Sequence, residues 1–190
     1  MTTTTIPGLD GLCTALDEAV REPDEERLTD AVKEALVRTV TSQALELPAE
    51  LTRPRPDGYA RRLLHLCPAG RYSVLAMTWG PGQATPLHDH DGRWCVEGVY
   101  SGEIEVTRYD LVEERDGRYR FRLEGAVRAG VGNAGTLIPP FDYHTIANTS
   151  GDAPAVTLHV YGGEMTRCTV FTAHDDGWYE RQQRTLSYHD

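Results

Sequence analysis

From residue 58 onward the chain consists of short β-prone runs separated by turn residues, and this pattern restricts its fold more than any other feature. The runs are rich in Val, Ile, Leu, Tyr and Thr, while Gly, Pro, Asp and Asn stand between them. Many short strands at close spacing are typical of an all-β sandwich or barrel. A hairpin turn is predicted at residues 113–117. The expected strands are residues 59–66, 71–79, 85–90, 94–100, 103–112, 117–123, 134–138, 143–147, 154–161 and 167–173.

The first part of the chain has a different pattern. Apolar residues recur at i, i+3 and i+4 spacing over residues 8–21 and 24–45, which predicts two amphipathic helices. Residues 46–57 contain three prolines and are expected to form a loop. We therefore expect one domain over residues 1–190, with a helical N-terminal cover (1–50), a β-barrel (55–175) and a C-terminal tail (176–190).

Bulk properties exclude several classes of protein. The net charge of −10 argues against nucleic-acid binding, which needs clustered Lys and Arg. No apolar run approaches the length of a membrane span, and the N-terminus does not have the pattern of a secretory signal, so a cytoplasmic protein is expected. The four cysteines form no CxxC pair, which argues against a disulfide framework or a Cys-rich zinc site. The sequence leaves the choice between monomer and homodimer open.

One pair of histidines has the spacing of metal ligands. His88 and His90 flank Asp89, and alternate residues of a strand face the same side. Both imidazoles are therefore expected to point into the barrel, with Asp89 pointing away. Imidazole binds Fe, Zn, Cu and Ni. The pair alone is weak evidence, because histidines also occur in polar interiors without any metal.

The residues around this pair resemble the first motif of the cupin family. In that motif a Gly, two His, a Glu and a second Gly hold fixed spacings. Here the segment reads Gly82-x5-His88-x-His90-x4-Cys95-x6-Gly102. Only one position departs from the motif, because Cys95 stands where the cupin Glu ligand is found.

A second segment is similar to the other cupin motif. Pro139, His144 and Asn148 hold the spacing of that motif, while Phe141 replaces its Gly. The resemblance implies a cupin (double-stranded β-helix or jelly-roll) barrel, mainly β, with N-terminal helices. It also implies a metal site with three protein ligands, His88, His90 and His144.

Without the carboxylate, such a site has a distinctive charge. Three neutral imidazoles leave a divalent metal with its full 2+ charge, which favours an anionic ligand such as a thiolate. Up to three coordination positions stay open, and the related two-His-one-carboxylate site uses its open face for O2 activation. The sequence therefore favours a redox metal that accepts substrate and O2 together.

The Cys in place of the cupin Glu resembles the cysteine dioxygenase family. The segment Thr157-Leu-His159-Val-Tyr161 is similar to the Ser/Thr-x-His-x-Tyr strand of thiol dioxygenases. Strand alternation puts Thr157, His159 and Tyr161 on one face, where their side chains can form a hydrogen-bonded row. In the family the Tyr lies beside the iron, and in the eukaryotic-type branch it is joined to the Cys. The resemblance thus implies catalytic roles for these four residues and a possible Cys95–Tyr161 thioether crosslink.

The same resemblance covers roughly residues 55–173 and implies a substrate pocket. Tyr59 and Arg61 match the family's Tyr-x-Arg, whose guanidinium pairs with the substrate carboxylate. A planar guanidinium meets a carboxylate in bidentate fashion. The adjacent Arg62 is a second candidate for this role. Cys168 matches a pocket Cys of the mammalian-type enzymes, and Trp94 is close enough to the metal strand to line a pocket.

Some residues depart from the mammalian-type pattern. Gly162, Gly163 and Glu164 replace a Ser-Pro-Pro, and Trp94 replaces a His before the Cys. The mercaptopropionate-type branch has a Trp-Gly near this point and an Arg further on, in the region of Arg167. These differences concern the identity of the thiol.

The function implied by the resemblance is an Fe(II) thiol dioxygenase that takes L-cysteine and O2 to cysteine sulfinate, with small molecules as its partners. One alternative is a related oxygenase that acts on 3-mercaptopropionate or converts cysteine to another biosynthetic product. A second is a non-catalytic metal-binding cupin that senses a ligand or oxygen. A zinc hydrolase is less favoured, because no Glu stands beside the His pair as a general base.

Overall fold

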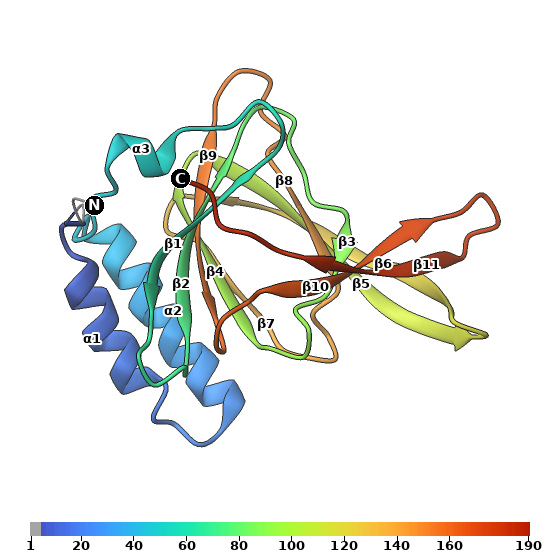
Figure 1. Ribbon diagram of the computed structural model, residues 1–190, viewed down its shortest axis with the longest axis horizontal. Coiled ribbons are helices and arrows are strands. Elements are labelled where there is room, and N and C mark those ends of the chain that lie inside the picture. The colour runs from blue at the N-terminus through green and yellow to red at the C-terminus, as the bar shows by residue number, and fades with distance from the viewer. Residues whose placement is uncertain (1–4) are drawn as a thin grey trace.

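The computed structural model describes residues 5–190, so the first four residues of the predicted N-terminal cover lie outside the described part. Figure 1 shows helices packed on one side of a β-barrel, with two strand hairpins extending from the opposite side. The helices are α1 (Leu9–Ala19), α2 (Glu25–Thr41) and α3 (Ala49–Thr52). The strands are β1 (Ala60–Leu66), β2 (Ser73–Trp79), β3 (Leu87–His88), β4 (Cys95–Ser101), β5 (Glu103–Arg115), β6 (Arg118–Gly130), β7 (Ala134–Leu137), β8 (His144–Ala147), β9 (Ala155–Tyr161), β10 (Arg167–Ala173) and β11 (Tyr179–Thr185).

The two long helices form where the apolar periodicity predicts them. Asp24 caps α2 by accepting a hydrogen bond from the backbone N–H of Arg27 (3.0 Å). Leu16 and Leu36, in the apolar stripes of α1 and α2, are fully buried against the sheet. No helix in the described part of the chain is long and apolar enough to cross a membrane.

Two antiparallel sheets make up the rest of the chain. The first has the strand order β1-β2-β9-β4-β7, and the second has the order β10-β11-β6-β5-β8-β3. Pairing between β3 and β10 closes the second sheet into a barrel. The molecule is thus a mainly β, cupin-type barrel with N-terminal helices, as the sequence predicts.

Strand alternation gives the first sheet two buried faces. Every residue of β9 is buried, although only one of its faces lines the barrel. Leu158 and Val160 pack with α1 and α2 in one cluster, whereas His159 and Tyr161 point to the interior. The helices therefore cover the outer face, and the inner face is left free for polar side chains.

Several boundaries differ from the predicted ones. The loop at residues 46–57 contains α3, and the expected tail at residues 176–190 contains β11. Nearly all of β11 is exposed, and its main chain pairs with β10. Because β11 has no buried face, its sequence lacks the apolar alternation that predicts a strand. β3 is also shorter than the predicted strand, which places His90 in a loop.

The hairpin turn is confirmed. Asp116 and Gly117 both have positive φ angles, +54° and +74°, as a two-residue hairpin turn of type I′ requires. β5 and β6 pair up to this turn, from Glu103 opposite Gly130 to Arg115 opposite Arg118.

Candidate metal centre

The three predicted histidines converge inside the barrel. His88 and His144 are directly paired residues of β3 and β8, and their ring centroids lie 4.4 Å apart. The His90 ring centroid lies 4.9 Å from that of His144. One nitrogen from each ring lies within 4.8 Å of the other two, a spacing that fits three ligands of one ion.

His90 reaches this position from a loop. Its backbone N–H donates to the Asp142 carboxylate (2.9 Å), and the same carboxylate oxygen lies 3.6 Å from its ring Nδ1. After it the chain turns through Asp91 and Gly92, which both have positive φ. Asp142 thereby ties the loop of His90 to the segment that carries His144, a contact that sequence reasoning missed.

The environment selects the metal-binding form of the rings. The Nδ1 atoms of His88 and His144 lie 3.1 and 2.7 Å from the backbone oxygens of Pro86 and Asp142, which leaves each Nε2 to face the centre. Burial lowers the pKa of all three imidazoles below the usual range, so they are neutral at neutral pH. Among residues 5–190, no hydrogen-bond partner is found for the buried His144 Nε2. These donors fit a transition-metal ion.

The predicted row on β9 is confirmed. The Trp79 indole N–H donates to Thr157 Oγ1 (2.9 Å), and Thr157 Oγ1 lies 2.8 Å from His159 Nε2. On the other side of the ring, His159 Nδ1 lies 3.3 Å from the Tyr161 hydroxyl. Burial lowers the pKa of His159 to about 3 and raises that of Tyr161 well above its usual value. The row therefore holds a neutral imidazole next to a protonated phenol.

Cys95 lies directly beside this row. It is the cross-strand partner of Tyr161, and its Sγ lies 4.0 Å from His159 Nδ1. Burial raises the pKa of the Cys95 thiol well above its usual value. The thiol is therefore protonated and enclosed at neutral pH.

The predicted pocket residues line the same small cavity as the histidines. Tyr59, Arg61 and Cys168 contribute to the wall of this cavity of about 20 Å³. Tyr59 stacks on Trp79 at a centroid distance of 4.7 Å. Burial raises the pKa of Cys168 to about 11. The structure thus brings the aromatic, cationic and thiol groups of the predicted pocket together at the metal centre.

The structure also separates the two adjacent arginines. Arg61 points to the cavity, while the Arg62 side chain extends to the opposite face of β1 and donates to Leu51 O and Arg53 O. Arg61 donates to the backbone oxygens of Met165 (3.0 Å) and Ser187 (3.2 Å). Of the two arginines, Arg61 therefore lines the cavity and Arg62 is bonded away from it.

Two residues considered from the sequence lie elsewhere. Trp94 was expected to line the pocket, but it packs in the core between the helices and the first sheet, where its indole abuts Gly162. This expectation was wrong because Trp94 precedes Cys95 and so faces the other side of the strand. Arg167 is exposed and pairs with Asp91 (2.7 Å), away from the cavity. Asp89 points away from the site as expected, and accepts from the backbone N–H groups of Asp91 and Thr169.

One buried carboxylate was missed. Glu97 is only 5% exposed, and its Oε2 lies 3.8 Å from His144 Nε2 and 3.6 Å from His159 Nδ1. A buried carboxyl group therefore lies beside the three predicted histidines, and the sequence analysis did not anticipate it. Burial raises the pKa of Glu97 to about 8. Strand alternation was the available signal, because Glu97 follows Cys95 by two residues and shares its face.

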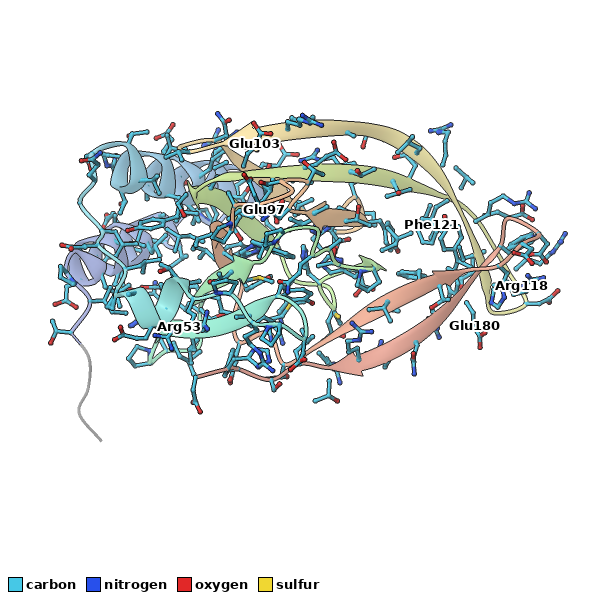
Figure 2. The ribbon with its side chains drawn as sticks, turned by 90° about the horizontal axis from the view of Figure 1, so that it is seen from above. Arg53, Glu97, Glu103, Arg118, Phe121 and Glu180 are labelled. Atoms are coloured by element: carbon cyan, nitrogen blue, oxygen red, sulfur yellow. The ribbon has the colours of Figure 1, made fainter. Side chains whose placement is uncertain are left out.

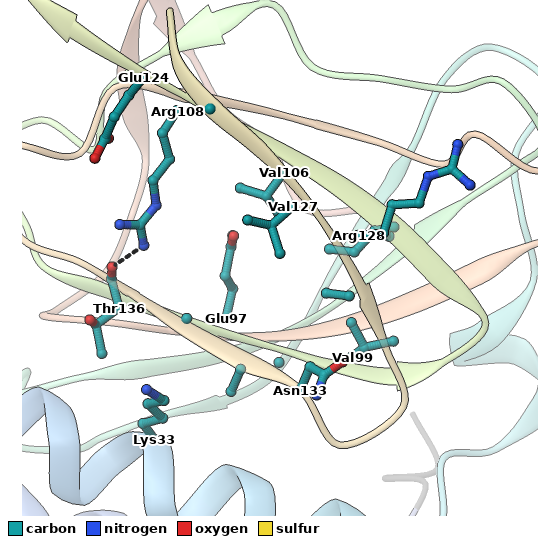
Figure 3. Close-up of a pocket in the computed structure, with 16 residues that line it drawn as sticks. Lys33, Glu97, Val99, Val106, Arg108, Glu124, Val127, Arg128, Asn133 and Thr136 are labelled. Atoms are coloured by element: carbon teal, nitrogen blue, oxygen red, sulfur yellow. Dashed lines mark hydrogen bonds between the residues drawn. The ribbon is translucent and has the colours of Figure 1, made fainter.

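Glu97 also borders a larger cavity of about 700 Å³ between β4, β7, β5 and β6. Figure 3 shows Glu97 in the middle of this cavity, with Lys33 and Arg108 on opposite sides. The Arg108 guanidinium is directed to the backbone oxygen of Thr136 (3.0 Å). Figure 2 places Glu97 in the body of the barrel, far from the hairpin ends that carry Arg118 and Glu180.

Comparison with known proteins shows which family this chain matches. The profile of the family described as Cysteine dioxygenase type I matches residues 26–174. Cysteine dioxygenase type 1 of Rattus norvegicus is 22% identical over 120 residues, which cover 63% of this chain and 58% of the relative. The Danio rerio protein of the same name is 24% identical over 102 residues, covering 54% and 50%. The chain thus matches little more than half the length of these curated relatives.

Solved structures with a similar arrangement are more distant. A conserved protein with a double-stranded β-helix domain from Klebsiella pneumoniae has a TM-score of 0.49 and 18% identity, covering 65% of this chain and 87% of that one. Oxalate oxidase in complex with the substrate analogue glycolate has a TM-score of 0.45 and 20% identity, with 62% and 59% covered.

Proposed function

Because the chain belongs to the cysteine dioxygenase type I family, we propose that it is an Fe(II) thiol dioxygenase that oxidises L-cysteine to cysteine sulfinate. The observation that supports this most is the convergence of His88, His90 and His144 in one cavity with Arg61 and Tyr161. A bound Fe(II) would supply the positive charge that favours a thiolate and the redox chemistry that O2 requires. We further propose that the protein is cytoplasmic and has one domain, and that it is a monomer or a homodimer.

The overall reaction balances without another reactant. A thiolate and one O2 give a sulfinate, so both oxygen atoms enter the product. The sulfur loses four electrons and O2 gains four. The protein therefore needs no nucleophile of its own, and its residues act by binding and orienting the reactants.

Arg61 is proposed to bind the substrate carboxylate. Its guanidinium already lies at the cavity wall, 4% exposed, with two backbone oxygens as acceptors. A carboxylate that replaces the Ser187 carbonyl gains a charge-assisted hydrogen bond in a desolvated position. This exchange orients the thiol end of the substrate toward the histidines.

Tyr161 is proposed to donate a hydrogen bond to the reacting oxygen atoms or to the substrate. The raised pKa keeps its phenol protonated, and His159 and Thr157 hold the ring in place. Trp79 fixes the far end of the row by donating to Thr157. Thr157, His159 and Tyr161 therefore present one oriented hydrogen-bond donor, the Tyr161 hydroxyl, and it stays uncharged.

Product analysis tests the proposal. Protein loaded with Fe(II) is incubated with cysteine under 18O2, and the products are analysed by mass spectrometry. We expect cysteine sulfinate with two labelled oxygens, no product without O2, and no product from His144→Ala. His174→Ala, which changes an exposed histidine outside the cavity, serves as the matched control and is expected to behave like the parent. Unlabelled product, or turnover without O2, would contradict the mechanism.

Two other functions are distinguished by the same assay. The kcat/KM values for cysteine and 3-mercaptopropionate identify the preferred thiol, and the product mass identifies a biosynthetic oxygenase that yields something other than the sulfinate. A non-catalytic metal-binding cupin that senses a ligand or oxygen is the remaining candidate. Metal binding without turnover of either thiol would support that alternative.

A further inference from the structure

The cavity that holds the three histidines is too small for a thiol substrate. It measures about 20 Å³, whereas pockets that hold small molecules usually measure about 300–1,000 Å³. Cysteine carries a carboxylate, an amine and a thiol, and such a molecule does not fit this space unless the wall moves. The proposed reaction therefore requires that one part of the wall opens.

One wall residue is less firmly placed than most of the others. The strands β1, β2, β3, β8, β9 and β10 carry most of the lining side chains. Leu186 lines the same cavity, but it follows the end of β11 at Thr185 and belongs to no helix or strand. It is partly exposed and packs against the cluster that contains Cys95 and Tyr161. Leu186 therefore lies between the metal centre and solvent.

Residues 186–189, which we call the closing segment, lie beside β1. Figure 1 shows the chain after β11 running back from the hairpin to its end near β1. The Leu186 N–H donates to Thr166 O (2.8 Å), and His189 exchanges two hydrogen bonds with the backbone of Arg61 (2.7 and 3.0 Å). No residue of the closing segment is buried. Segments with few buried contacts and exposed backbone hydrogen bonds open at low cost, so we expect this part of the wall to open first.

The closing segment also occupies Arg61, the proposed partner of the substrate carboxylate. Ser187 O accepts a hydrogen bond from the Arg61 guanidinium (3.2 Å). The Tyr188 ring lies over the same guanidinium, with 5.5 Å between the guanidinium carbon and the ring centroid. The Tyr188 hydroxyl donates to the Glu164 carboxylate (3.1 Å). A substrate carboxylate that replaces Ser187 O on Arg61 removes one of these contacts, so substrate binding and opening are linked.

We propose that the closing segment opens to admit the thiol, and that Leu186 sets the size of the thiol that fits when the segment closes again. This inference rests on the proposed function, because it concerns the substrate of the same site. In the closed position the Leu186 side chain fills space at the cavity wall that a longer substrate would need. In hydrophobic pockets one additional methylene changes kcat/KM by about 10–200-fold. Shortening Leu186 should therefore move the preference toward longer thiols.

Two thiols that differ by one methylene test the role of Leu186. Steady-state kinetics of Fe(II)-loaded protein give kcat/KM for L-cysteine and L-homocysteine in the parent, Leu186→Ala and Leu63→Ala. Leu63 is the matched control, because it packs partly buried against the same cluster but does not line the cavity. We expect the ratio of homocysteine to cysteine to rise about 10-fold or more in Leu186→Ala and to keep its parental value in Leu63→Ala.

Labelling of Cys168 tests the opening without any turnover. Cys168 lines the cavity and is 4% exposed, so a thiol reagent reaches it only when the wall opens. Purified parent, Tyr188→Ala and Tyr179→Ala are treated with iodoacetamide, and peptide mass spectrometry follows the modification. Tyr179 lies at the other end of β11 and does not line the cavity. We expect about 10-fold faster labelling of Cys168 in Tyr188→Ala alone. Cys13 in α1 should be labelled at the parental rate in all three proteins.

Several results would overturn the inference. A parental homocysteine-to-cysteine ratio in Leu186→Ala, or an equal rise in Leu63→Ala, excludes Leu186 as the residue that sets the size of the thiol. A parental rate of Cys168 labelling in Tyr188→Ala excludes the opening of the closing segment. If the parent protein with Fe(II) oxidises neither thiol while Cys168 labelling still responds to Tyr188→Ala, the proposed function fails and the closing segment stands. The two failures are therefore distinguishable.

Discussion

Cys95 on β4 and Tyr161 on β9 are directly opposed residues of neighbouring antiparallel strands. Both side chains face the barrel interior and belong to one buried cluster. Sequence position alone suggested the pair, and the register of the two strands places the residues side by side.

We predict that this pair forms a thioether crosslink during aerobic turnover with Fe(II). Bond formation between Cys95 Sγ and the Tyr161 ring removes two hydrogen atoms, and O2 is the oxidant. Intact-mass measurement before and after turnover should show this loss, and peptide mapping should join the two strands. The loss should be absent from Cys95→Ala and present in Cys168→Ala, which changes another thiol of the cavity. An unchanged mass after many turnovers would exclude the crosslink.

Replacing Arg61 should selectively impair substrates that carry a carboxylate. In Arg61→Met we expect KM for cysteine to rise about 10–100-fold, because a charge-assisted hydrogen bond contributes about 1.5–3 kcal/mol. Steady-state kinetics with cysteamine, which lacks the carboxylate, should change little. Arg167→Ala removes an exposed arginine outside the cavity and should leave both substrates unaffected. Equal losses for cysteine and cysteamine would indicate damage to the fold instead.

Two glycines with similar φ angles should respond differently to alanine. Gly102 has φ +76°, and a Cβ there would lie 2.8 Å from Pro154 O, whereas Gly117 has φ +74° and open space around it. Gly117→Ala should cost about 1–2 kcal/mol for the left-handed backbone. Gly102→Ala should cost about 2–5 kcal/mol, because overpacking adds to this strain. Urea denaturation measures both, and equal losses would show that β4 and β9 adjust without cost at this corner.

The Cys13 thiol should titrate at an unusually high pH. Burial raises its pKa from 9.0 to about 11 in the folded protein. Its contribution to stability is fully present below pH 9 and is lost as the pH rises toward 11, because only the unfolded state ionises readily in that window. Alkylation by iodoacetamide, followed by peptide mass spectrometry, should show a midpoint near 11 in the native protein and near 9 in urea. The same midpoint in both states would contradict the assigned burial.

Much of the candidate site follows from local patterns. The spacing of His88 and His90 predicts two ligands, and the alternation of Thr157, His159 and Tyr161 predicts their row, which the structure contains. Such patterns are readable because ligands and strand faces repeat at fixed sequence intervals. Trp94 shows the limit of the approach, since closeness in sequence to the metal strand does not give the face on which a side chain lies.

Other features depend on contacts between distant segments. Asp142 holds the loop of His90, and the backbone of Ser187 meets Arg61 across 126 positions of sequence. β11 forms through main-chain pairing that its side chains do not encode. No local periodicity reports such contacts, because they are decided by which strands become neighbours when the barrel closes.

The sequence by itself determined the class of fold, the three histidines and the residues of the β9 row, since each depends on spacing within a few residues. Only the tertiary structure decided which carboxyl group lies beside the centre. Glu97 was visible as a strand residue on the face of Cys95, but its distance to His144 depends on how β4 and β8 are placed by the closed barrel. The effect of a buried carboxyl group depends on the groups around it, and the packing of distant strands decides which groups these are.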